Sequence, residues 1–238
     1  MPISNAAALR ADDLKQLFAV YGDFYQLNLG GEPLSCRVVL ELVAHARVPL
    51  LVNRLAELQP DLLVVMMNPG SSKPIDAGYV PRVVGTEGAG ARPERVLTRP
   101  DTTQYQVMRV MAARGWGHAR VLNLSDLRQA KSLLWRQQVA QLASVPGGEK
   151  HSLFCAARQE ERHRIMGPTG AIPVLLGWGR DEEMRPLAQQ CLRALQGWPV
   201  MGVPTDEEGI FYAHPSPMLQ KAKDRWLEEI LLRLQKWG

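Results

Sequence analysis

The segment "FYAHPSPM", residues 211–218, places a histidine between an aromatic pair and two prolines. Each proline fixes φ and lacks a backbone N–H, so the segment cannot be ordinary helix or central strand. We expect a rigid turn that holds His214 in place. An imidazole N–H held in this way can donate a hydrogen bond to negative charge that develops during a reaction.

Two asparagines follow apolar runs that have the pattern of buried strands. A run of six apolar residues, 62–67, stops at "NPG", residues 68–70, and Asn123 lies near the end of a second run, residues 120–124. An amide side chain can donate and accept hydrogen bonds at once. Because ligands of parallel α/β sheets bind at the carboxyl ends of the strands, we expect both asparagines and the histidine turn to meet at one site.

Strand and helix patterns alternate along most of the chain. Further strands are expected from "AIPVLLGWGR" and "WPVMGVP", and helices from residues 101–117, 132–143, 151–166, 181–196 and the amphipathic C-terminal stretch. Strands separated by helices imply parallel crossovers. The expected fold is a single domain, residues 1–238, built as a three-layer α/β/α sandwich around a central, mostly parallel four-stranded sheet.

Two stretches lie outside this alternation. Residues 1–60 contain "LRADDLKQLFAVYG" and "CRVVLELVAHARVPLLVNRLAELQ", which we interpret as helices of an N-terminal extension packed on the sandwich. Residues 71–100 are rich in glycine, proline and arginine and predict a long functional or mobile loop.

Taken in order, four segments resemble the motifs of the uracil-DNA glycosylase superfamily: "MMNPGSS", "VLNLSDL", "VLLGWG" and "HPSPM". The resemblance covers roughly residues 61–237 and leaves the first sixty residues uncovered. The segments "MNPGSSK", "DTT" and "NLSDLRQAK" are also similar to the DUF1643 family of uncharacterised bacterial proteins. Each motif is short, and their joint order at strand ends is what makes the match informative.

The resemblance implies a DNA glycosylase without metal or cofactor, which flips a pyrimidine out of the stack and hydrolyses its N-glycosidic bond. His214 would donate a hydrogen bond to the departing base, Asn68 would position the attacking water, and Asn123 would pair with the base edge. Pro69 and Gly70 would complete the base pocket. An amide at Asn68 cannot accept the proton of that water as a carboxylate could, which argues against efficient uracil excision.

Gly70 indicates which base is bound. In the uracil-specific branch of the superfamily, a bulky tyrosine at this place blocks substituents at the pyrimidine 5-position. A glycine leaves that side of the pocket open. We therefore expect a 5-substituted pyrimidine, such as thymine in a mispair or a modified cytosine of phage DNA, in base excision or in defence against phage.

Contacts to DNA are expected from residues around these motifs. Phosphate contacts and a wedge into the base stack would come from Ser71, Ser72, Lys73, Arg128, Ser216, Met218 and Lys221. Four arginines of the long loop could follow the DNA backbone or close over a flipped base, or could simply be solvated: Arg82, Arg92, Arg95 and Arg99.

Two other functions stay open. A hydrolase of free nucleosides or nucleotides would use the same pocket without a DNA-binding surface. A non-catalytic DNA-binding member of the fold would keep that surface without turnover, which the missing carboxylate at Asn68 allows. The motifs of dinucleotide-binding enzymes, phosphate-loop enzymes and Ser-His-Asp hydrolases are missing from the sequence.

Composition adds weak constraints. The net charge of +4 suits a phosphate-rich partner without requiring one. No apolar run approaches the ~20 residues that span a bilayer, and the N-terminus lacks the pattern of a leader, so we expect a cytoplasmic protein, as a monomer. Cys36, Cys155 and Cys191 show no Cys-x-x-Cys spacing and are expected to be buried small hydrophobes.

Overall fold

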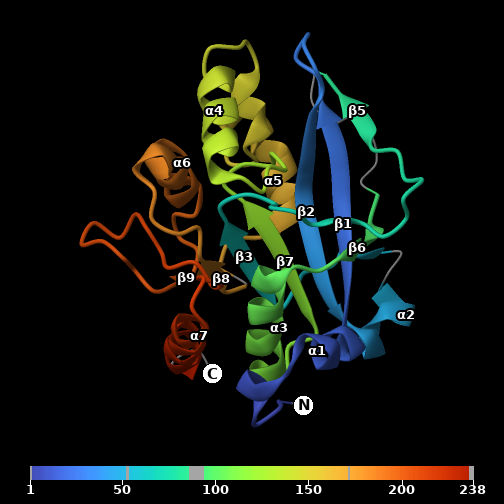
Figure 1. Ribbon diagram of the computed structural model, residues 1–238, viewed down its shortest axis with the longest axis vertical. Helices are drawn as coiled ribbons and strands as arrows, with labels where there is room; N and C mark the ends of the chain where they lie inside the picture. The colour runs from blue at the N-terminus through green and yellow to red at the C-terminus, as the bar shows by residue number, and fades with distance from the viewer. Residues whose placement is uncertain (1, 52–53, 86–93, 171, 236–238) are drawn as a thin grey trace.

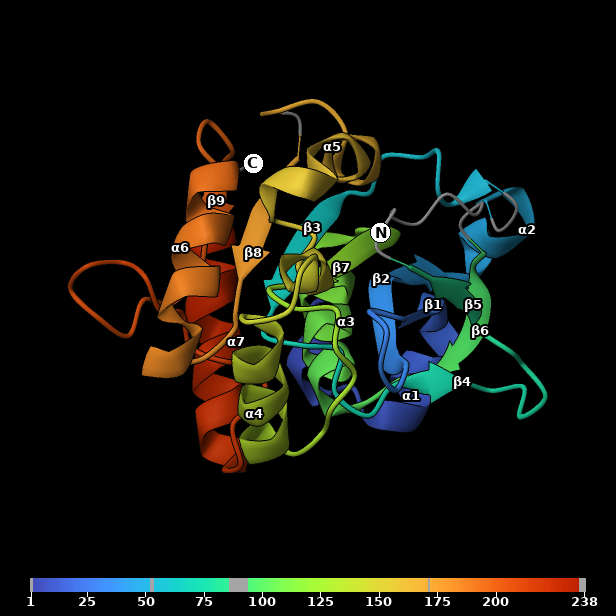
Figure 2. The same ribbon diagram turned by 90° about the horizontal axis from the view of Figure 1, so that it is seen from above.

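The computed structural model describes residues 2–51, 54–85, 94–170 and 172–235. A mixed sheet runs through the middle of the molecule and helices pack on both of its faces (Figures 1 and 2). The expected mixed α/β class is therefore confirmed. No helix within the described ranges is long and apolar enough to cross a membrane.

Nine strands are found in the described part of the chain, in the order β4-β6-β1-β2-β7-β3-β8-β9, with β5 paired to β1. Their bounds are β1 (Phe18–Leu27), β2 (Leu34–Ala44), β3 (Leu62–Met66), β4 (Lys73–Pro74), β5 (Arg82–Val84), β6 (Val96–Arg99), β7 (His118–Asn123), β8 (Val174–Leu176) and β9 (Val200–Met201).

The four predicted strands correspond to β3, β7, β8 and β9. They pair in parallel, β3 with both β7 and β8, and β8 with β9. These strands are only part of the sheet, because β2 pairs antiparallel with β7, and β1 pairs antiparallel with β2. The prediction of a mostly parallel four-stranded sheet was therefore wrong, since a long antiparallel hairpin and three short strands extend it.

The helices alternate with these strands. Their bounds are α1 (Ala11–Leu17), α2 (Val48–Leu51), α3 (Thr102–Arg114), α4 (Ser132–Leu142), α5 (Gln159–Met166), α6 (Arg185–Ala194) and α7 (Gln220–Gln235), with short 3₁₀ helices at Ala6–Ala8, His45–Arg47, Gly148–His151, Ala156–Arg158 and Glu182–Met184. Asp101 caps α3 and Gly115 ends it with φ of 69°.

The predicted helical extension over residues 1–60 was wrong for most of its length. Only Ala11–Leu17 is helical in the first predicted helix, and the chain then enters β1. The second predicted helix begins as strand β2, up to Ala44, and in its described part only Val48–Leu51 is α-helical. β1 contains Phe18, Phe24, Tyr21 and Tyr25, and β2 contains three valines, which are residue types that favour strands. Both strands are buried along almost their whole length, so they lack the alternation of apolar and polar residues that would distinguish a strand from a buried helix.

The predicted loop over residues 71–100 contains three short strands, β4, β5 and β6, which pair with the hairpin or with each other. Arg92 lies outside the described residues. The long stretch is therefore tied to the sheet at several points in its described part.

Two apolar cores lie on the two faces of the sheet. Helices α1, α3 and α7 cover one face, and α4, α5 and α6 cover the other. Figure 1 shows α4, α5 and α6 above the parallel strands and α1, α3 and α7 below them. Cys36, Cys155 and Cys191 are buried and free, as expected.

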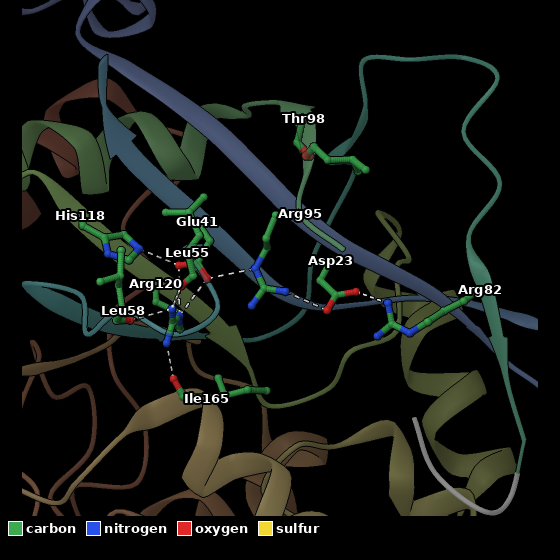
Figure 3. A network of polar contacts seen from close by, with 11 residues as sticks. Asp23, Glu41, Leu55, Leu58, Arg82, Arg95, Thr98, His118, Arg120 and Ile165 are labelled. Atoms are coloured by element: carbon green, nitrogen blue, oxygen red, sulfur yellow. Dashed lines mark hydrogen bonds and ion pairs between the residues drawn. The ribbon is translucent and has the colours of Figure 1, made fainter. Parts of the chain in front are cut away.

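A buried charge network joins the hairpin to β7 (Figure 3). Glu41 on β2 accepts hydrogen bonds from His118 Nε2 at 2.9 Å, Arg120 Nε at 2.9 Å and Arg95 Nε at 3.1 Å. Arg95 also donates to Asp23 on β1 at 2.8 Å. Burial alone would raise the pKa of Glu41, but Arg120, His118 and Arg95 lower it to about 2. The hairpin is therefore held to the parallel strands by charge as well as by backbone hydrogen bonds.

We predict that Glu41→Gln lowers the free energy of unfolding by about 3 kcal/mol or more, because it leaves buried cations without their partner. The lowered pKa means that this contribution is complete above the ordinary carboxyl pKa of about 4.5 and is lost as the pH falls toward 2. Urea unfolding at pH 7 and pH 3 measures both effects. Glu57→Gln, at an exposed ion pair, serves as the control and should change stability little.

Candidate active site

A cavity of about 90 Å³ lies where β3 and β7 end. It brings together all five residues predicted to catalyse the reaction or bind the base: Asn68, Pro69, Gly70, Asn123 and His214. The other lining residues are Arg37, Met66, Asp101, Thr103, Gln104, Val107 and Val121. Because Met66 and Asn123 are register partners in parallel strands, the loops that follow them leave the sheet side by side.

The His214 turn is fastened to three elements. Trp226 Nε1 of α7 donates to Ala213 O at 3.1 Å, and Gln106 Nε2 of α3 donates to Pro215 O at 3.2 Å. A Cβ on Gly177, the residue after β8, would lie 3.0 Å from the ring of Pro215, which is a tight contact, so glycine favours the close approach of the turn. The turn therefore has the fixed position that its prolines predict.

His214 presents one free ring nitrogen. The Ser216 backbone N–H donates to its Nδ1 at 3.1 Å, so a neutral imidazole carries its proton on Nε2. Burial lowers the pKa of His214 below its ordinary value, which keeps the ring neutral near pH 7. The residue thus offers the cavity an N–H donor without a full positive charge.

The side chain of Asn123 is completely buried. Neither its amide nitrogen nor its amide oxygen has a hydrogen-bond partner among the described residues. Each such buried group costs about 1–3 kcal/mol when left unpaired. A donor and an acceptor side by side, facing a cavity, are what a ligand with the complementary pair would satisfy.

Asn68 is held by one end of its amide. Its Nδ2 donates to Gln129 O at 2.6 Å, which leaves Oδ1 as the free atom of the side chain. An amide oxygen can accept a hydrogen bond from water and orient it, but it cannot take up the proton. The predicted positioning role thus remains compatible with the observed contacts.

Gly70 has φ of +63°, a left-handed conformation that side chains rarely adopt. The turn by itself therefore accounts for the glycine. A Cβ here would meet only Asp101 Oδ2, at the ordinary contact distance of 3.5 Å, so there is space for a small group at this position. Gly70→Tyr would strain the backbone as well as fill space, which makes it a poor probe of pocket size.

Two charged residues of the cavity were not among the predicted site residues. The Oδ1 atom of Asp101 caps α3 by accepting from Thr103 N and Gln104 N, and its Oδ2 makes no hydrogen bond within the described chain. The sequence shows the cap, but the second oxygen matters only because α3 begins next to the β3 turn. Arg37 comes from β2, in the stretch expected to be helical, where no motif marks it.

Some of the residues predicted to contact DNA are exposed, whereas others are buried or hydrogen-bonded within the protein. Ser71, Lys73, Met218 and Lys221 are exposed, with Met218 99% accessible. Ser216 is half-buried. Ser72 is buried, and its hydroxyl donates to Arg99 O at 3.4 Å, so it does not face solvent. Arg128 donates to Ser72 O at 2.7 Å and is half-buried.

A second cavity, of about 380 Å³, begins just after the β3 turn. Basic and aromatic side chains share its lining: Phe24, Lys73, Tyr79, Arg99 and Arg128. Arg128 lies over the ring of Phe24 at 5.0 Å. Such a mixture of cations and π-faces suits a strand of nucleic acid.

Two loop arginines have structural partners instead. Arg82 and Arg95 both pair with Asp23 of β1, and Arg95 also pairs with Glu41. They are therefore committed to the sheet and are not free to follow a DNA backbone. Arg99 is exposed and remains available.

No family model, curated protein or solved structure matches this chain. Within the described ranges, no group of three or more His, Cys, Asp or Glu side chains is arranged to hold a metal ion. The resemblance to uracil-DNA glycosylases stays a prediction, and the geometry of the cavity is what bears on function.

We predict that Asn123→Leu raises the free energy of unfolding by about 1 kcal/mol, because an apolar side chain of similar size removes two unpaired polar atoms. Ligand binding in the cavity should be lost in the same variant. Asn28→Leu is the matched control, since Asn28 Oδ1 accepts a hydrogen bond from Gly30 N and its loss should destabilise. Chemical unfolding measures the change in the free energy of unfolding, which should be positive for Asn123→Leu and negative for Asn28→Leu. A negative change for Asn123→Leu would contradict an unpaired amide.

Proposed function

We propose that the protein is a DNA glycosylase that binds a flipped pyrimidine in the cavity and hydrolyses its N-glycosidic bond. One observation carries this proposal: the fully buried, unpaired amide of Asn123 lines a cavity that also holds the neutral imidazole of His214. A pyrimidine edge has an adjacent donor and acceptor that the amide can pair with in two hydrogen bonds.

The size of the cavity favours a pyrimidine over a purine. At about 90 Å³ it is smaller than the cavity of about 150 Å³ that holds benzene, so a single ring would have to extend beyond it and the two rings of a purine would fit less well. A substituent at the 5-position would need the open side near Gly70. We therefore propose thymine or a modified cytosine as the substrate, with its 5-substituent in the space beside Gly70.

The cavity residues fit the steps of hydrolysis. Water attacks C1′ of the sugar while the C1′–N1 bond breaks and leaves its electron pair on the base. Nε2–H of His214 would donate to the base as this charge develops, and such preorganised donors contribute on the order of 3 kcal/mol. Asn68 Oδ1 would orient the water.

Asp101 supplies the carboxylate that Asn68 lacks. Its spare Oδ2 lies on the side of the cavity nearest the β3 turn and has no other hydrogen bond in the described chain. A carboxylate can accept the proton of the attacking water, which the amide of Asn68 cannot. We therefore assign the water-activating role to the pair, with Asn68 orienting and Asp101 accepting the proton.

DNA is favoured over a free nucleoside by the surface beside the cavity. Lys73, Arg99 and Arg128 share the second cavity with two aromatic rings, and exposed Met218 projects from the His214 turn. Cations bind phosphates, and an apolar side chain can fill the gap left by a flipped base. Binding to duplex DNA that weakens with salt would separate this function from hydrolysis of free nucleosides.

Incubation with oligonucleotides that carry uracil, mispaired thymine, 5-hydroxymethylcytosine or its glucosylated form tests the reaction. We expect one substrate to yield free base and alkali-labile strands, detected by mass spectrometry and gel electrophoresis. His214→Ala should slow release about 10²- to 10³-fold, as loss of one preorganised donor does. DNA binding without base release from any substrate would favour the non-catalytic alternative.

Asp101→Asn separates catalysis from capping. Asparagine caps a helix as well as aspartate does, so the melting temperature should stay nearly unchanged. Base release should slow about 10²-fold or more because the general base is gone. Undiminished release in Asp101→Asn would show that the carboxylate takes no proton.

A further inference from the structure

A β-bulge turns Arg37 into the cavity. The register of β1 and β2 skips Val38, which is the extra residue of the bulge. In a regular strand Arg37 and Val39 would point to the same face. Instead Val39 packs in the core under α4, α5 and α6, whereas Arg37 lines the cavity together with Val107 of α3, on the opposite face. Bulges beside active sites commonly re-aim a side chain in this way.

Arg37 is a buried cation with little compensation. It is 2% exposed, its Nη1 donates to Pro69 O at 3.3 Å, and its Nε has no partner in the described part of the chain. No ion pair to a carboxylate is found for it among those residues. By contrast, equally buried Arg120 has Glu41 and the carbonyl of Leu58 as partners. An unpaired buried charge is expensive, so its place is explained when a ligand brings the opposite charge.

The surrounding charges do not remove this deficit. Asp101 and Asp126 lie near enough to favour the charged guanidinium, and Arg128 opposes it. Burial, together with Arg128, outweighs the two aspartates and lowers the pKa of Arg37 to about 10, so the side chain is still charged at neutral pH. The cavity therefore combines a permanent cation with the neutral donor His214.

We propose that Arg37 is a further catalytic residue, which binds the pyrimidine base as it departs as an anion. This inference rests on the proposed function. As the C1′–N1 bond breaks, its electron pair spreads from N1 onto the carbonyl oxygens of the base. The guanidinium gains an ionic hydrogen bond only at that stage, so it stabilises the transition state more than the bound substrate. His214 and Arg37 then share the leaving-group charge.

The kinetic test compares two leaving groups. Fluorine withdraws electrons, so the anion of 5-fluorouracil is more stable than that of uracil. We expect Arg37→Gln to slow single-turnover release of uracil from DNA about 10²- to 10³-fold and to slow release of 5-fluorouracil less. Arg37→Lys should recover part of the rate. Arg54→Gln removes one positive charge at an exposed ion pair and should have no effect.

Calorimetric binding of the free bases gives a readout that needs no catalysis. Between pH 7 and 9 free 5-fluorouracil becomes an anion while uracil stays largely neutral, and Arg37 remains charged. In the wild type, affinity for 5-fluorouracil should rise by up to about 10-fold with pH, as the anion that forms the charged hydrogen bond replaces the neutral base. It should stay flat in Arg37→Gln, which should melt no lower than the wild type because an unpaired charge has been removed.

The outcomes separate the two proposals. If no oligonucleotide is cleaved but the rise in affinity depends on Arg37, the glycosylase function fails and the anion site stands. If cleavage occurs and Arg37→Gln slows both leaving groups equally, without changing the pH dependence of binding, the function stands and the role of Arg37 is refuted. A lower melting temperature with those same results would identify Arg37 as a structural residue.

Discussion

The cost of burying polar groups at the carboxyl ends of β3 and β7 is the constraint on which the candidate site depends. Asn123 has two amide atoms without partners, and Arg37 has a charge without a counterion in the described chain. Glu41 is buried as deeply, but two arginines and a histidine compensate its charge. Among the described residues, Asn123 is the one whose side-chain donor and acceptor are both buried without a partner, and it lies with Arg37 where a cavity could admit a ligand.

The hairpin that distinguishes this fold also supplies part of the site. Strands β1 and β2 extend the parallel strands by antiparallel pairing, and the charge network around Glu41 fixes them to β7. Three residues before Glu41, the bulge at Val38 reverses the side of the sheet to which Arg37 points. Strand β2 therefore contributes Glu41 to the charge network that stabilises the fold and Arg37 to the lining of the cavity.

The local patterns of the sequence were sufficient for the strands that carry the motifs. An apolar run ending in Asn-Pro-Gly predicts β3 and its turn, and paired prolines predict the fixed position of His214. The hairpin was missed because strands buried on both faces lack the alternation that distinguishes them from helices. Arg37 could not be found from spacing, because its direction depends on a bulge that only strand pairing reveals. The proximity of Asp101 Oδ2 to the cavity likewise depends on the packing of α3, which the sequence does not show.

Binding of a pyrimidine to the Asn123 amide is the central claim, and nuclear magnetic resonance can observe that amide directly. The side-chain N–H₂ signals of ¹⁵N-labelled protein, assigned with Asn123→Leu, would be followed during titration with free uracil and with adenine. Binding in the cavity predicts that the Asn123 signals shift downfield with uracil, as the amide acquires its missing acceptor, and do not respond to adenine. Unchanged Asn123 signals with uracil, or an equal response to adenine, would contradict it.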